Sequence, residues 1–193
     1  MTPTLSKALL GDLRELITEA RQDVARQVSS ALVLLYWRVG KRVRQDVLKE
    51  KRAEYGGRIV SAVGRQLESE FGRGFGEKNL RRMVQFVEQF PDVEIVAALL
   101  RQLGWTHFTM LLPISDPLKR DFYPEMCRIE RWSTRTLEKK IGGMLFERTA
   151  LSKKPKELVR PELNALHAED KLTPDLVFRD LYFLDLTSSA ISD

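Results

Sequence analysis

The feature that most constrains the fold is a series of apolar residues spaced three or four apart through the first 49 residues. The spacing matches the helical turn of about 3.6 residues, and no proline occurs between Thr4 and Pro91. It predicts one helix from about Leu5 to Lys49, about 70 Å long at 1.5 Å per residue. The apolar positions, which would form one stripe along one helix face, are Leu9, Leu13, Leu16, Ala20, Val24, Val28, Ala31, Leu35, Val39, Val43 and Val47.

A helix of that length cannot bury its whole stripe against a chain of 193 residues, and two interpretations are open. In the first, the stripe pairs with another helix, as in a coiled coil, and the chain is a homo-oligomer. In the second, the helix bends and packs on its own domain. Gly40 is the one weak position, because glycine inside a helix costs roughly 1 kcal/mol relative to alanine.

A glycine-rich pattern after this helix predicts a helix–turn–helix. The Tyr-Gly-Gly of residues 55–57 is expected to interrupt the helix, and a second helix then carries apolar residues every four positions from Ile59 to Phe71. It should stop in the Gly-Arg-Gly-Phe-Gly turn of residues 72–76, where glycines can adopt positive φ angles. A third helix is expected to begin near Glu77 and to be closed by Pro91.

The start of this third helix has side chains suited to DNA. The second helix of a helix–turn–helix places its N-terminal part in the major groove, where Arg reads guanine and Asn reads adenine. A helix N-terminus also favours a phosphate. Paired helices with a glycine turn are common in all-helical proteins, so a purely structural role stays open. The candidate contacts are Lys78, Asn79, Arg81 and Arg82, with Arg73 in the turn.

The charge is distributed unevenly, which favours a polyanion as partner. The net charge is +5, yet residues 38–82 hold 13 basic and 6 acidic residues, and residues 119–160 hold 12 and 6. Basic segments of this kind suit DNA, with RNA as an alternative, although solvated helix faces give the same composition. In the second segment a helix capped by Ser133 carries the candidate contacts Arg135, Lys139 and Lys140.

No catalytic, metal or cofactor site is predicted. Cys127 is the single cysteine, which excludes an internal disulfide and a cysteine zinc cluster. His107 lies among apolar residues and is interpreted as a satisfied core histidine. Asp92 after Pro91, followed far downstream by Glu138-Lys139-Lys140, formally matches the PD…ExK nuclease pattern, but that pattern needs strands and Glu138 lies in a helical pattern. We expect a cytoplasmic protein, since no signal peptide or membrane-spanning segment is recognised.

Several segments together resemble a known family. They include Phe-Gly-Glu-Lys-Asn-Leu-Arg-Arg-Met at residues 75–83 and Leu-Gly-Trp-Thr-His-Phe at residues 103–108, with further segments at residues 35–42, 122–123, 132–137 and 175–185. The chain resembles, over roughly residues 10–186, the N-terminal helical domain of the YhcG-type family of predicted PD-(D/E)xK nucleases. The resemblance implies that a separate nuclease domain follows this domain in the family. Its catalytic residues have no counterpart here, so we expect a non-catalytic chain, either a truncated nuclease or a stand-alone module.

The resulting prediction is an all-α protein, with a long N-terminal helix followed by a helix-turn-helix-like helical bundle. Its expected domains are a long helix at residues 1–54, a helical domain at 55–150, and a linker with an acidic tail at 151–193. The predicted function is nucleic-acid binding within a nuclease system. The alternative is a self-associating assembly module without DNA contact.

Overall fold

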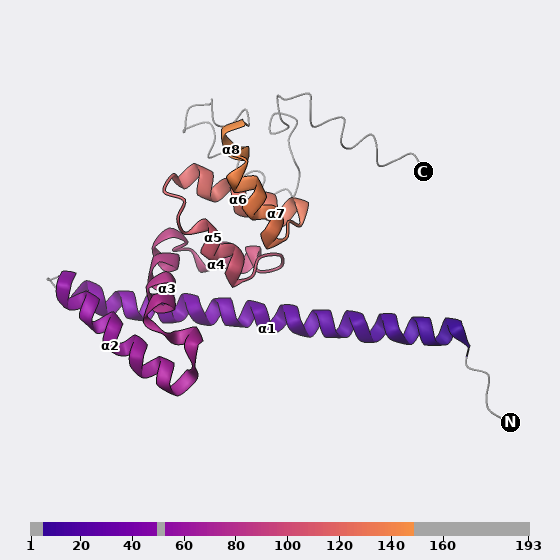
Figure 1. Ribbon diagram of the computed structural model, residues 1–193, viewed down its shortest axis with the longest axis horizontal. Coiled ribbons are helices and arrows are strands. Elements are labelled where there is room, and N and C mark those ends of the chain that lie inside the picture. The colour runs from indigo at the N-terminus through magenta and orange to yellow at the C-terminus, as the bar shows by residue number, and fades with distance from the viewer. Residues whose placement is uncertain (1–5, 50–52, 149–193) are drawn as a thin grey trace. The chain divides into compact units, whose positions relative to one another are not determined.

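The computed structural model describes residues 6–49 and 53–148, and every regular element in them is helical, which confirms the all-α prediction for this part of the chain (Figure 1). The linker and acidic tail predicted for residues 151–193 lie outside the described residues. Among the helices described, none is long and apolar enough to span a membrane. The helices are α1 (Lys7–Lys49), α2 (Ala53–Phe71), the 3-10 helix η1 (Arg73–Phe75), α3 (Glu77–Gln89), α4 (Val93–Leu99), α5 (Trp105–Leu111), α6 (Pro117–Glu130), α7 (Thr134–Gly142) and α8 (Leu145–Arg148).

The chain divides into two compact units, Met1–Trp105 and Thr106–Asp193. The divisions predicted after residues 54 and 150 stay a prediction, and the second lies outside the described residues. The first unit combines α1 with α2, η1, α3 and α4, so the long helix shares a core with the helices that follow it. The second unit holds α6, α7 and α8.

The long N-terminal helix is present as predicted. α1 has 43 residues, which is about 65 Å at 1.5 Å per residue, and its N-terminal half extends beyond α2 and α3 in Figure 1. The prediction that so long a helix cannot bury its whole apolar stripe is confirmed. Eight large apolar side chains of α1 are 38% to 63% exposed, namely Leu9, Leu13, Leu16, Ile17, Val24, Val28, Leu32 and Leu35.

The prediction that the stripe keeps to one face of the helix was wrong. Leu35 is 42% exposed, whereas its neighbours Tyr36 and Trp37 are buried, as are Val33 and Gly40. Each residue advances about 100° around a helix, so a four-residue step adds about 40° and a pattern rich in such steps winds around the axis. Its later members Val39 and Val43 therefore pack partly buried against the core, whereas its earlier members lie on another side of the helix.

Aromatic rings of α1 connect it to both ends of α3. Tyr36 packs edge-on against Phe75 and Trp105, with ring centroids 5.8 Å and 4.9 Å apart. The indole N–H of Trp37 donates to the carbonyl of Phe90 at 2.8 Å. These contacts fix α3 along the C-terminal half of α1.

The glycine pair at residues 56–57 lies inside α2 and does not interrupt it, so the prediction of a helix break at these glycines was wrong. α2 begins at Ala53 and includes Gly56 and Gly57, and the Gly57 carbonyl accepts a hydrogen bond from the Ser61 hydroxyl at 3.1 Å. Glycine lowers helix propensity, but tertiary packing overrides it here, since Gly56 is buried. The turn between α2 and α3 forms as expected, with Gly72 at φ 88°.

Gly40 is a packing position and not the weak point that its helix propensity suggested. A Cβ atom at Gly40 would lie 2.0 Å from the carbonyl oxygen of Met83 and 2.5 Å from the Met83 carbonyl carbon. The backbones of α1 and α3 thus meet at this point, and only a residue without a side chain fits there.

Capping side chains begin two helices of the second unit, and the cap by Ser133 was predicted from the sequence. Asp116 caps α6 by accepting a hydrogen bond from the Leu118 N–H, with Pro117 in the first turn. Ser133 caps α7 by accepting from the Thr136 N–H at 3.2 Å. The helices of this unit enclose fully buried rings, among them Phe108, Phe122 and Tyr123.

The Gly40 contact leads to a stability prediction. Gly40→Ala should lower the free energy of unfolding by about 1–3 kcal/mol, because the overpacking strain exceeds the gain in helix propensity. Urea unfolding followed by circular dichroism measures this. The matched control is Gly11→Ala, also in α1, where a Cβ atom meets nothing within 4 Å and no loss is expected. Equal stability of the two variants would contradict the close approach.

Candidate nucleic-acid interface

α3 turns an apolar side to the first unit and a basic side to solvent. Lys78, Arg81 and Arg82 are all exposed, and their spacing of three and four residues puts them on neighbouring positions of the helix surface. The opposite side is packed inside the unit. Its buried residues are Leu80, Met83, Phe86 and Val87. The structure therefore brings together three of the basic residues predicted from the sequence.

The three cations differ in their partners. Arg81 forms an ion pair with Glu77, its Nη2 lying 2.7 Å from Oε1, and also approaches the Ser61 hydroxyl at 3.4 Å. The hydrogen bond from Arg81 lowers the pKa of Glu77 below its ordinary value. Within the described residues, Lys78 and Arg82 have no hydrogen bond or ion pair. Their charges are therefore available to an external anion.

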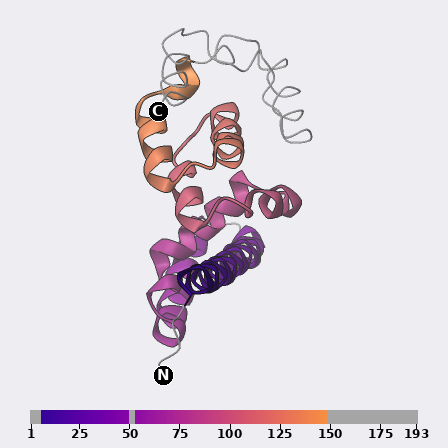
Figure 2. The same ribbon diagram turned by 90° about the vertical axis from the view of Figure 1, so that its right-hand side faces the viewer.

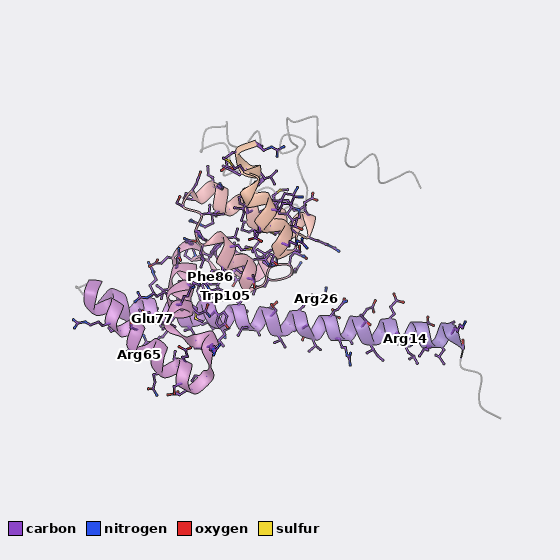
Figure 3. All side chains as sticks on the ribbon, viewed as in Figure 1. Arg14, Arg26, Arg65, Glu77, Phe86 and Trp105 are labelled. Atoms are coloured by element: carbon purple, nitrogen blue, oxygen red, sulfur yellow. The ribbon has the colours of Figure 1, made fainter. Side chains whose placement is uncertain are left out.

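The N-terminus of α3 does not offer the open phosphate site expected from the sequence. The Glu68 carboxylate lies beside the capping residue Gly76, where a Cβ atom would be 2.6 Å from its Oε2. α2 covers the first turn as well, since a Cβ atom at Gly64 would be 2.7 Å from the Glu77 backbone. Figure 3 shows Glu77 close to this part of α2. A phosphate here would meet the negative charge of Glu68, so the basic side of α3 is the better anion surface.

Both ends of the Asn79 side-chain amide form hydrogen bonds within the first unit. Its Nδ2 donates to the Gly74 carbonyl at 2.5 Å, and its Oδ1 accepts from the indole N–H of Trp105 at 3.2 Å. Trp105 in turn packs against Phe86, with ring centroids 5.4 Å apart, and Figure 3 shows these two residues together. Reading an adenine edge would require Asn79 to give up these bonds. The sequence carried no sign of the bond to Trp105, because it joins residues 26 apart.

Arg73 lies at the edge of this surface. It is the first residue of η1, between Gly72 and Gly76, and its side chain is exposed. It has no ion pair among the described residues. The turn thus adds one more available cation near the start of α3.

The second predicted basic surface belongs to the second unit. Arg135 and Lys139 are exposed one helical turn apart on α7, with Leu137 buried on the opposite side. The Lys140 ammonium lies over the Trp132 ring, 5.4 Å from its centroid, which holds it closer to the protein surface. The two basic surfaces lie on different units and are therefore separate candidates.

The residues that matched the PD…ExK pattern are Asp92, which has a structural role, and Glu138, which is exposed. Asp92 caps α4 by accepting a hydrogen bond from the Glu94 N–H at 2.8 Å, and Glu138 lies on α7. The described residues contain no strand and no group of three or more residues able to hold a metal ion. The Nε2 of His107 lies 3.2 Å from the Trp132 carbonyl, and burial lowers the pKa of the imidazole.

Basic residues on α1 were missed in the sequence prediction. Arg38, Lys41 and Arg42 are exposed at helical spacing, next to the residues that pack on α3. Lys41 lies over the Trp37 ring at 4.8 Å from its centroid, and Arg42 pairs with Asp46 at 2.6 Å. Their spacing of three and four residues was a signal present in the sequence. Arg38 alone of the three has no partner in the described part of the chain.

A comparison with protein families matches residues 12–148 to the DUF1016 N-terminal domain. The chain belongs to this family. The match covers α3 and α7 and nearly all of α1, so both candidate surfaces are part of the DUF1016 N-terminal domain.

One curated relative of the DUF1016 chain is named "Putative nuclease YhcG", from Escherichia coli (strain K12). The two are 26% identical over 200 residues, which is 88% of this chain and 52% of the relative. This confirms the resemblance inferred from the sequence, and the chain spans about half the length of the relative that it matches. No solved structure matches the chain significantly.

The bonds of Asn79 give a prediction that separates positioning from contact. Asn79→Ala should lower the free energy of unfolding by about 1–2 kcal/mol, because it leaves the Trp105 N–H and the Gly74 carbonyl without this partner. Lys78→Ala, the neighbouring control, should change it by less than about 0.5 kcal/mol. Chemical unfolding monitored by Trp fluorescence compares the two. Equal small effects would show that the amide bonds do not support the fold.

Proposed function

We propose that this chain is a non-catalytic nucleic-acid-binding module of a nuclease system, with DNA as its target. Lys78 and Arg82 are the main contacts, Arg81 and Arg73 support them, and Asn79 positions the start of α3. The observation that carries the proposal is the exposed, unpaired charge of Lys78 and Arg82 on a helix whose other side is buried.

The physical basis is electrostatic. Phosphates neutralised by Lys and Arg release the counterions condensed on a duplex, and this supplies most of the affinity that does not depend on sequence. A helix fixed along one side and basic along the other suits such contact, because its cations are ordered before binding. α3 meets both conditions through its packing on α1 and α2.

The basic surface of α7 is proposed as an auxiliary contact. Arg135 and Lys139 would add phosphate contacts from the second unit, and Lys140, held over Trp132, would add less. Binding through two surfaces would raise the affinity beyond that of either alone.

Catalysis is assigned to a part of the system other than this domain. The relative is named a nuclease, but the chain matches only about half of it, through the N-terminal DUF1016 domain. Metal-dependent DNA cleavage by this chain that Glu138→Gln abolishes would overturn the non-catalytic assignment.

A second candidate is an assembly module that self-associates without touching DNA. The exposed apolar stripe of α1 favours it, since eight large side chains there are 38% to 63% exposed. The two candidates are compatible, and DNA binding tells them apart.

Removing the charges of Lys78 and Arg82 should weaken mainly the salt-dependent, electrostatic part of DNA binding. We expect Lys78→Ala with Arg82→Ala to lower affinity for a random-sequence duplex at least about tenfold, and to reduce the slope of log affinity against log salt by about 2. Fluorescence anisotropy of a labelled duplex between about 50 and 200 mM salt measures both quantities.

The control removes one cation from a position away from α3. Arg26→Ala lies on the free half of α1, where Arg26 pairs with Asp23, and it should leave the affinity nearly unchanged. Absence of binding by the unaltered chain at either salt concentration would overturn the proposal. A structured RNA as competitor decides between DNA and RNA, and tighter binding of RNA would reassign the target.

Removing the anion that holds Arg81 should have the opposite effect. Glu77→Gln frees Arg81 and deletes one negative charge beside the surface, so DNA affinity is expected to rise several-fold at low salt. Glu15→Gln, an equal charge change on α1, is the control and should have no such effect. A fall in affinity for Glu77→Gln would mean that the ion pair orders Arg81 for binding.

A further inference from the structure

The free half of α1 carries charges of opposite sign on the two sides of its apolar stripe. Counting about 100° per residue from the centre of the stripe places one sign on each side as far as Arg21, while Arg26 lies on the acidic side and pairs with Asp23. Figure 3 shows this half of the helix, with Arg14 and Arg26, extending away from the remainder of the first unit. The basic side holds Lys7, Arg14 and Arg21, and the acidic side holds Asp12, Glu19 and Asp23.

The stripe points away from the body of its own unit. By the same count, the exposed positions from Leu9 to Val24 lie roughly opposite the buried positions Val33, Tyr36 and Gly40. Leu32, at 38% exposure, lies closer to the side of Tyr36. Figure 2 looks along α1 from its N-terminal end and shows α2 and α3 on one side of it. A second helix can therefore lie along the stripe without meeting α2 or α3.

The stripe is large enough to be an interface. It is about 39 Å long between Leu9 and Leu35, and at a helix width of about 10 Å it covers about 400 Å². A continuous apolar patch of a few hundred Å² on a protein surface commonly marks an interaction site. Two such stripes facing each other would form a small interface, so the population of the complex should depend on concentration.

We propose that residues 7–35 of α1 pair in parallel and in register with the same residues of a second copy of this chain. The charges select the orientation. In a parallel pair the twofold axis sets the basic side of one copy against the acidic side of the other. In an antiparallel pair, basic faces basic and acidic faces acidic.

The register brings opposite charges to similar heights along the pair. Asp12 of one copy and Arg14 of the other differ by two residues, which is about 3 Å along the axis. Glu19 and Arg21 repeat the arrangement one heptad later. Four such contacts form in each dimer, two from each copy, at the edges of the apolar stripe.

The same charges disfavour other occupants of the stripe. From Lys7 to Arg21 the 3 basic residues lie on one side and the 3 acidic residues on the other, whereas Arg26 lies on the acidic side and pairs with Asp23. A uniformly acidic or uniformly basic helix would meet a like-charged side, whereas a second copy meets opposite charge on both. The proposal is independent of nucleic-acid binding, and its tests need no DNA.

The first test is the mass of the full chain by sedimentation equilibrium over a wide range of concentration. The unaltered chain should approach the mass of a dimer. Leu16→Lys should raise the dissociation constant at least about tenfold, whereas Gln22→Lys, the same charge on the opposite side of α1, should not. Leu16 is 62% exposed, so its change does not disturb the core. A monomer at every concentration, or a Leu16→Lys dimer of unchanged stability, overturns the proposal.

The second test is orientation, by disulfide formation. Burial raises the pKa of the native thiol, Cys127, to about 12, so an introduced cysteine on α1 reacts selectively. A parallel pair lets Leu9→Cys cross-link to itself readily. An antiparallel pair centred on Leu16 and Ile17 instead links Leu9→Cys to Val24→Cys when the two variants are mixed. That mixed product, with no Leu9→Cys self-product, overturns the parallel arrangement.

Reversing charges on α1 tests whether ion pairs between the two copies select the parallel orientation. Arg14→Glu with Arg21→Glu makes both sides acidic, and Asp12→Arg with Glu19→Arg makes both sides more basic. Each double variant should be mostly monomeric alone, and a mixture of the two should restore a dimer that weakens with salt. A mixture that stays monomeric while both double variants remain helical by circular dichroism contradicts the charge pairing.

Discussion

The first unit depends on the direct approach of the α1 and α3 backbones at Gly40 and Met83. No side chain separates the helices there, so α3 has little freedom to turn about its own axis. Tyr36 and Trp37 secure its two ends through a ring contact to Phe75 and a hydrogen bond to the Phe90 carbonyl. The side of α3 that faces solvent, with its cations, follows from this arrangement.

α1 contributes to two different surfaces because it is long and its apolar pattern winds around the helix axis. Its C-terminal half supplies Val33, Tyr36 and Trp37 to the core, while its N-terminal half keeps Leu16 and Val28 exposed on another side. A pattern confined to one face would have placed the free stripe in line with the core contacts. A partner helix would then have met α2 and α3.

Local signals made much of this fold predictable. Apolar periodicity located α1 and α3, and the capping residue Ser133 located the start of α7. The failures depend on contacts between distant residues. Propensity made Gly40 a weakness, but it is required by Met83, 43 positions further on, and base-reading chemistry suggested Asn79, whose amide is bonded to Gly74 and Trp105. The spacing of apolar and polar residues in the sequence predicts neither the Gly40–Met83 contact nor the hydrogen bonds of Asn79.

The proposed pairing of α1 bears directly on how α3 would meet a duplex. Gly40, where α3 packs, lies 24 positions from Leu16, on which the antiparallel pair described above is centred, or about 36 Å along the helix. In an antiparallel pair the two α3 helices would therefore lie at opposite ends of the pair, about 70 Å apart along the axis. A parallel, in-register pair places both at the same end, where they can reach two sites about one helical turn of DNA apart, or about 34–36 Å. The charge pattern along the stripe of α1 would then set the spacing at which the basic surfaces of α3 act together.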